Sequence, residues 1–81
     1  MEKILLFSDD EKLFEITKQV TEGKQELIRG NYQCLETNRY PFADVVIMHF
    51  DENKIRKDIL QPIIKVKGRL GHLTPILAVI E

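Results

Sequence analysis

The sequence predicts a small α/β domain with a mainly parallel sheet and helices packed on it. Two observations carry this prediction. Short, continuously apolar runs are typical of strands covered on both faces, and stretches with helical apolar spacing lie between them. The predicted order is strand, helix, strand, strand, helix, strand, which favours parallel pairing. Right-handed crossovers then place the first strand in the middle of the sheet, beside the third. Eighty-one residues suffice for one domain and not for two.

The first unit is a strand, an acidic turn and a helix. Residues 1–7 form the strand, because four large apolar residues follow one another from position 4. Ser8 or Asp9 can cap the helix, and the next two acids place negative charge at its positive end. Gly23 ends the helix. Its apolar stripe consists of Leu13, Phe14, Ile16 (or Thr17) and Val20.

Residues 24–42 allow two interpretations. A strand over 26–29 can turn at Gly30 into a second strand over 32–36, which makes a hairpin. The alternative is one strand followed by a short helix that ends near Tyr40. The first strand is common to both, and the second element stays open.

The second half predicts a central strand, a helix and a last strand. Residues 43–50 are the clearest central strand, because 45–48 are continuously apolar. Pro62 lies inside the helical stripe that follows and is expected to kink or split that helix. Residues 76–80 form a last buried strand that begins after a proline. The stripe consists of Ile55, Ile59, Ile63, Val66 and Leu70.

Composition excludes several classes of protein. No apolar run approaches the ~18–20 residues of a membrane helix, and the first apolar run is too short for a signal peptide. The single cysteine, Cys34, cannot form an internal disulfide, which favours a cytoplasmic protein. Residues 1–53 are acidic and residues 54–81 are basic, and a basic segment is either a solvated helix face or a nucleic-acid contact. Its cations are Lys54, Arg56, Lys57, Lys65, Lys67 and Arg69.

Candidate chemistry lies after the first and third strands, since ligands of open parallel sheets bind at the carboxyl ends of central strands. Asp9 and Asp10 are weak candidates for Mg²⁺; otherwise they only cap a helix. His49 can bind a metal, accept a phosphoryl group on nitrogen, or serve as a hydrogen-bonded structural residue. We expect no tightly bound cofactor.

Three motifs in order resemble a response-regulator receiver domain of the CheY-like, flavodoxin-like family. Residues 3–11 (KILLFSDDE) resemble its opening strand and acidic pair, residues 43–48 (ADVVIM) its third strand, and residues 73–77 (LTPIL) the entry to its fourth. The resemblance covers nearly the whole chain, but residues 24–42 match poorly. It implies a single receiver-like domain over residues 1–81, truncated after the fourth strand and lacking the last strand and helices.

The departures from that family concern its chemistry. His49 stands where the family has its phospho-accepting aspartate, Ser8 replaces the first acid, and Ile80 replaces the hydroxyl residue that ends the fourth strand. The family's lysine after a fifth strand has no counterpart. An acyl phosphate needs a carboxylate nucleophile. The resemblance therefore implies a pseudo-receiver of two-component signal transduction that is not an enzyme and acts as a protein-interaction module. The alternatives are a metal-dependent phosphoryl acceptor using His49, and the N-terminal fragment of a longer response regulator.

The last strand predicts the partner. An apolar edge strand is a template for pairing with another chain. We therefore expect a protein partner, with a homodimer through the fourth strand as the simplest form, and neither a membrane nor nucleic acid. The expected interface consists of Thr74, Ile76, Leu77, Val79 and Ile80 with Ile55, Ile59 and Ile63 of the preceding helix.

Overall fold

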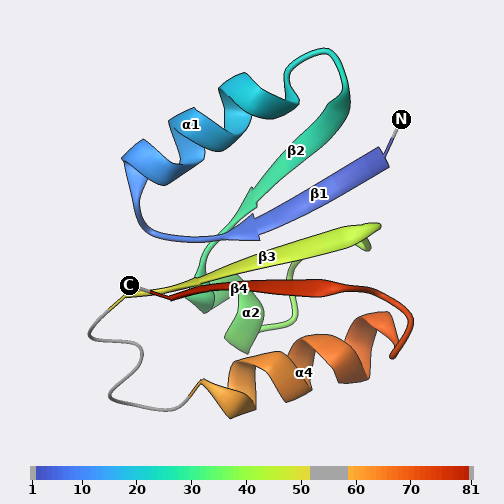
Figure 1. Cartoon of the computed structure of the whole chain (residues 1–81). Coiled ribbons are helices and arrows are strands. Elements are labelled where there is room, and N and C mark those ends of the chain that lie inside the picture. Colours follow the sequence, from blue (N-terminus) through green and yellow to red (C-terminus); the bar gives the residue numbers. More distant parts are fainter. Residues whose placement is uncertain (1, 52–58, 81) are drawn as a thin grey trace.

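The computed structural model describes residues 2–51 and 59–80. Four parallel strands form one sheet in the order β2-β1-β3-β4 (Figure 1). This confirms the α/β class, the parallel sheet and the position of the first strand beside the third. The elements are β1 (Glu2–Phe7), α1 (Glu11–Thr21), β2 (Gln25–Gly30), α2 (Tyr32–Glu36), β3 (Val45–Phe50), α4 (Leu60–Leu70) and β4 (Ile76–Ile80).

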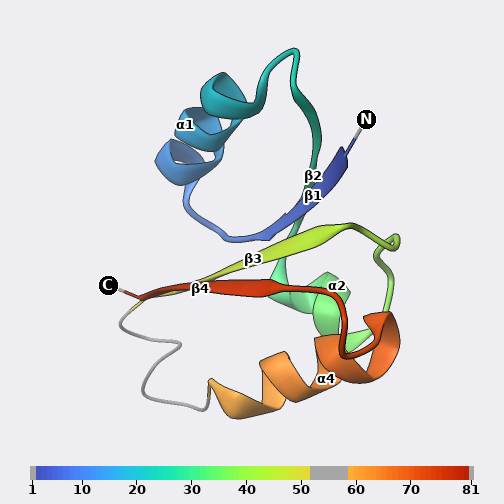
Figure 2. The ribbon, with the colours of Figure 1, turned by 45° about the vertical axis from the view of Figure 1, so that its right-hand side comes forward.

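The helices lie on both faces of the sheet. α1 covers one face over β1 and β2, and α2 and α4 lie against the other (Figures 1 and 2). Most of the buried core lies on the α2–α4 side of the sheet. Alternate residues of β1 and β3 point to this face and pack against residues of α2 and α4. The core residues are Leu5, Phe7, Tyr32, Leu35, Tyr40, Val46, Met48, Phe50 and Val66.

The α1 helix begins one residue later than the expected caps. Asp10, and not Ser8 or Asp9, is the N-cap, and its carboxylate accepts hydrogen bonds from the N–H groups of Lys12 and Leu13. Asp10 has the extended backbone of a cap residue, whereas Ser8 is already buried at the end of β1. The predicted stripe is also shifted, since Ile16 and Val20 are 59% and 67% exposed. Thr17 and Thr21 are more buried than either, together with Leu13 and Phe14.

Residues 24–42 form a strand and a short helix, so the hairpin interpretation was wrong. Asn31 caps α2, and its side chain accepts a hydrogen bond from the Cys34 N–H at 2.8 Å. An Asx cap of this kind favours a helix over a second strand. Gly30 precedes it at the point where β2 passes close to the Phe7 ring; a Cβ there would lie 3.0 Å from two ring atoms.

Pro62 lies in the first turn of α4, where its missing N–H leaves no helical hydrogen bond unmade. Within the described residues the helix begins at Leu60. The expected kink or split near Leu60-Gln61 stays a prediction, because residues 52–58, which precede this point, lie outside the described part of the chain. Ile59 and Ile63 pack against the chain's own core. Both are only partly buried, and their assignment to an intermolecular interface stays a prediction. Ile55 lies outside the described residues.

Candidate functional site

The carboxyl ends of β1 and β3 bring a serine and a histidine together. The Ser8 Oγ lies 3.0 Å from the His49 Nδ1, and both residues are buried, with exposed fractions of 2% and 4%. The Asp10 N–H donates a second hydrogen bond to the same Ser8 oxygen at 3.0 Å. His49 is thus held inside the fold by a hydrogen bond with Ser8.

The sheet register explains why these two residues meet. Phe7 of β1 stands opposite Met48 of β3. The next residues along the two strands, Ser8 and His49, therefore lie side by side, with their side chains on the face of the sheet that carries α1. Sequence reasoning named both positions but did not pair them. The sequence did indicate the pairing: Ser8 and His49 each follow directly after a run of four apolar residues, and these two runs form neighbouring parallel strands.

Tyr32 of α2, which sequence reasoning missed, contacts the end of β3 from the opposite face of the sheet. The Tyr32 hydroxyl donates a hydrogen bond of 2.7 Å to the His49 carbonyl oxygen. Burial, with the negative charges of Asp9 and Asp51, raises the pKa of Tyr32, so its hydroxyl stays protonated and remains a donor. Because the sequence left residues 32–36 open between a strand and a helix, it did not indicate which way the Tyr32 side chain points.

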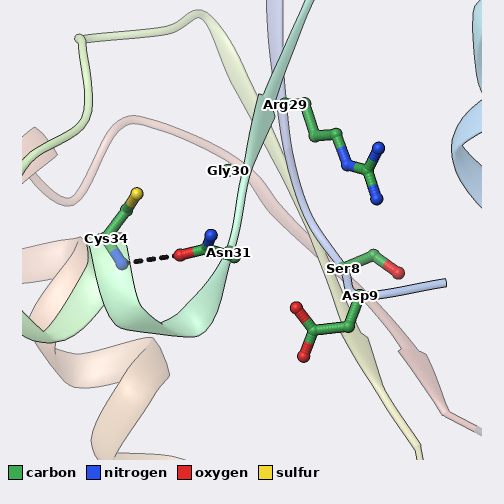
Figure 3. A pocket seen from close by; sticks show the side chains of 6 residues that line it. All are labelled: Ser8, Asp9, Arg29, Gly30, Asn31 and Cys34. Atoms are coloured by element: carbon green, nitrogen blue, oxygen red, sulfur yellow. Dashed lines mark hydrogen bonds between the residues drawn. The ribbon is translucent and has the colours of Figure 1, made fainter. Parts of the chain in front are cut away.

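Asp9 lines a small pocket at the same edge of the sheet. The pocket has a volume of about 260 Å³ and is lined by Ser8, Asp9, Arg29, Gly30, Asn31 and Cys34. Figure 3 shows the Asp9 carboxylate turned toward α2 and the Arg29 guanidinium turned away from it. That guanidinium binds the Glu11 carboxylate at 2.7 Å, which lowers the pKa of Glu11 and raises that of Arg29. The pocket therefore has one acid that no ion pair neutralises in the described structure.

The two acids proposed as Mg²⁺ ligands have different positions and roles. Asp10 caps α1, whereas Asp9 faces the pocket. In the described part of the chain, no group of three His, Cys, Asp or Glu residues is placed to hold a metal ion. Mg²⁺ prefers six well-placed oxygens, and this edge offers few of them.

Ile80 ends β4 opposite Phe50 and is 57% exposed. Its aliphatic side chain has no atom that can hydrogen-bond an anion. The end of β4 at Ile80 thus contributes apolar surface and no polar side chain.

A second region of interest surrounds β4. Four exposed, large apolar side chains lie on this strand and on the flank of α4 that points toward it. We call this set the β4 surface: Leu60, Ile64, Leu77 and Ile80.

Two contacts show which way the flanks of α1 and α4 face. Arg29 of β2 stacks 4.7 Å from the Phe14 ring centroid, so that flank of α1 faces β2. Ile16 and Val20 lie on the other flank of α1, away from β2. The Lys67 Nζ of α4 donates to the carbonyl oxygen of Thr74, just before β4. Leu60 and Ile64 share that flank of α4, because they precede Lys67 at helical spacing.

The described part of the basic segment makes contacts within the chain. Lys65 and Lys67 donate hydrogen bonds to the carbonyl oxygens of Glu36 and Thr74. Arg69 donates to the carbonyl oxygen of Tyr40 at 2.6 Å and lies over the Tyr40 and Phe42 rings. These cations connect α4 to its neighbours. The other three, Lys54, Arg56 and Lys57, lie outside the described residues.

The comparisons with known proteins add no assignment. No family model matches the chain, and no curated protein or solved structure shows significant similarity to it. Among the described helices, none is long and apolar enough to cross a membrane.

Proposed function

We propose that this chain is a degenerate receiver-like module that binds another protein and does not form an aspartyl phosphate. The observation that carries the proposal is the β4 surface, which places exposed apolar side chains on one outer strand of the described sheet and on the flank of α4 beside it. Exposed apolar patches of this kind mark interaction sites. The single cysteine is the reason that we place the module in the cytoplasm.

The buried pair Ser8–His49 supports the absence of phosphoryl chemistry. A phosphoryl acceptor must meet its donor, yet His49 is 4% exposed and its Nδ1 already lies 3.0 Å from the Ser8 Oγ. The alternative function, phosphorylation of His49, needs a ring nitrogen to reach solvent, and at Nδ1 it also needs this hydrogen bond to break. Unmade hydrogen bonds of buried groups are costly, at about 1–3 kcal/mol each.

We infer that the partner is a second copy of the chain, bound through β4. The proposed interface keeps Ile76, Leu77, Val79 and Ile80 from the sequence prediction and adds Leu60 and Ile64 of α4. Ile59 and Ile63 are partly buried against the core, as Ile76 is, and they stay in the proposed interface. Sedimentation equilibrium at tens of micromolar should give a mass near twice that of the chain, and a monodisperse monomer would contradict the homodimer.

The chemical half of the proposal is tested with acetyl phosphate and Mg²⁺. We expect no hydroxylamine-sensitive adduct by intact mass, because the carboxylate nucleophile is replaced by His49. His49→Asp alone should not restore efficient phosphorylation, since Ile80 remains apolar. An active receiver domain treated in parallel is the positive control, and an acyl phosphate on this chain would refute the proposal.

Mg²⁺ provides a second test at the same edge. We expect no change in Tm at low millimolar Mg²⁺, because Asp10 is engaged as a cap and Asp9 is a single carboxylate. A clear rise in Tm that Asp9→Ala abolishes would instead favour the metal-dependent alternative.

A further inference from the structure

We propose that β4 pairs with β4 of a second copy in an antiparallel manner, about a two-fold axis that passes through Ala78. The two four-stranded sheets then form one continuous eight-stranded sheet. This inference rests on the proposed homodimer and specifies its register, which the β4 surface alone does not define.

The direction of the backbone groups of β4 carries the argument. The Val46 N–H donates to the Pro75 carbonyl oxygen at 3.0 Å, and Val46 stands opposite Ile76 in the parallel ladder. The N–H and C=O groups of one residue point to the same side of a strand, and this side alternates along it. Leu77 and Val79 therefore face β3, as Pro75 does. The residues whose backbone groups face away from β3 are Ile76, Ala78 and Ile80.

These three outward-facing residues are symmetric about Ala78. Hydrogen-bonded antiparallel pairs require an outward-facing residue on each strand. With the axis at Ala78, Ala78 pairs with its own copy and Ile76 pairs with the partner's Ile80, so all three residues are paired. Among the described residues of β4, an axis at Leu77 or Val79 leaves one of the three unpaired. Within Ile76–Ile80, this register therefore makes the largest number of hydrogen bonds.

The strand cannot be lengthened at its start to favour another register. The Thr74 N–H donates to the Gly71 carbonyl oxygen at 3.4 Å, and its own carbonyl oxygen accepts from the Lys67 Nζ at 2.7 Å. Pro75 has no N–H to give. The usable edge therefore begins at Ile76.

The side chains in this register are compatible on both faces. On the α1 side, Leu77 stands opposite the partner's Val79. On the α4 side, Ile76 stands opposite the partner's Ile80, next to the exposed Leu60 and Ile64. Because β4 has no charged residue, no like charges meet across the axis. Many edge strands carry a lysine or a proline that prevents this pairing, and residues 76–80 carry neither.

The experiment compares two proline variants one residue apart. Ala78→Pro removes an N–H that faces the partner, and a proline is tolerated on an edge strand when its N–H position faces outward. Leu77→Pro removes an N–H that faces β3. We expect Ala78→Pro to sediment as a monomer with the far-UV circular dichroism of the parent chain, and Leu77→Pro to lose the folded signal. A dimeric Ala78→Pro would overturn the register.

Cysteine pairing gives a second measurement that does not depend on the proline variants. In a Cys34→Ser background, Ala78→Cys should form an intermolecular disulfide in a glutathione buffer, since its two Cα atoms lie about 5.5 Å apart. Ile76→Cys alone and Ile80→Cys alone should each form no disulfide, because the two copies of the same position lie roughly 13 Å apart between Cα atoms. A mixture of the two variants should cross-link, because position 76 of one copy stands opposite position 80 of the other. Lys18→Cys on α1 is the control that should not cross-link.

The outcomes separate this inference from the proposed function. A parent dimer that cross-links through another pair of positions, or not at all, overturns the register and leaves the homodimer in place. A parent chain that sediments as a monomer overturns both. Cross-linking at position 78 and between positions 76 and 80, with a monomeric Ala78→Pro, supports the register.

Discussion

The two outer strands of the sheet, β2 and β4, differ in how the chain treats their edges. β2 carries Glu26 and Arg29, and the Arg29 guanidinium binds Glu11 and lies over the Phe14 ring. β4 has five apolar residues and no charge. Charged side chains discourage pairing with another chain, and apolar edges favour it. The described sheet thus has one outer strand with charged side chains and one without any.

The helices reinforce this difference. The flank of α1 toward β2 offers Glu11 and Phe14 to Arg29, whereas its other flank exposes Ile16 and Val20. The comparison teaches that exposed apolar residues are informative when they gather beside one strand, since single exposed residues are common on any protein. Here the gathering identifies one edge of four strands.

The largest effect is expected from a charge placed in β4. Leu77→Lys should convert the dimer to a monomer, because it removes apolar contact at the interface and requires an ammonium group to be desolvated in each copy. Leu77 is 57% exposed, so its burial in the dimer contributes about 1 kcal/mol per copy. The dissociation constant should therefore rise at least tenfold, as measured by sedimentation.

The matched control adds the same charge to the other edge. Gln25→Lys lies at the start of β2 on the same face of the sheet. It should leave the mass of the assembly unchanged. If both lysine variants dissociate the dimer, or neither does, the contrast between the two edges is wrong.

A smaller effect is expected where β2 is fixed to β1. Gly30→Ala places a methyl group 3.0 Å from two carbons of the buried Phe7 ring. Overpacking of this kind costs about 1–3 kcal/mol, which should appear in denaturant unfolding of the variant. Gly68→Ala on the exposed side of α4 meets no atom within 4 Å and should stabilise the chain by about 0.5–1 kcal/mol. A neutral Gly30→Ala would mean that the Phe7 ring moves freely.

Sequence alone predicted the strands because their apolar runs are long and continuous. The runs that became β1, β3 and β4 need no tertiary information, and the right-handed crossover rule predicted that the first strand lies beside the third. The Asx cap at Asn31 was harder to predict, because Gly30–Asn31 is equally typical of a hairpin turn. The packing of Tyr32 and Leu35 into the core is what favours a helix over a second strand at residues 32–36.

The candidate site was predicted as positions but not as contacts. His49 and Ser8 were both named, yet their hydrogen bond depends on the register of β1 and β3. The apolar stripe of the second long helix was predicted as an interface, although periodicity cannot tell which neighbour covers it. Ile63 packs on the core, and its neighbour Ile64 is 59% exposed. A helix with apolar residues on two sides therefore needs the structure to assign each side.

The smallest effect is expected from the ion pair that protects β2. The Glu11 carboxylate is exposed, and its hydrogen bond and attraction to Arg29 lower its pKa relative to the unfolded chain. A lowered folded-state pKa means that the pair stabilises the fold above the unfolded pKa of Glu11, and that this contribution is lost as the pH falls through the folded pKa. Surface pairs contribute little, and salt screens them. Glu11→Gln should therefore lower Tm slightly at neutral pH and low salt, with the difference from the parent chain vanishing in acid. Glu26→Gln, on the same edge, is the control and should show no such pH-dependent difference. If the Glu11→Gln difference grew on acidification instead, the ion pair would not be what holds Arg29 over α1, and the protection of this edge would rest on the Phe14 contact alone.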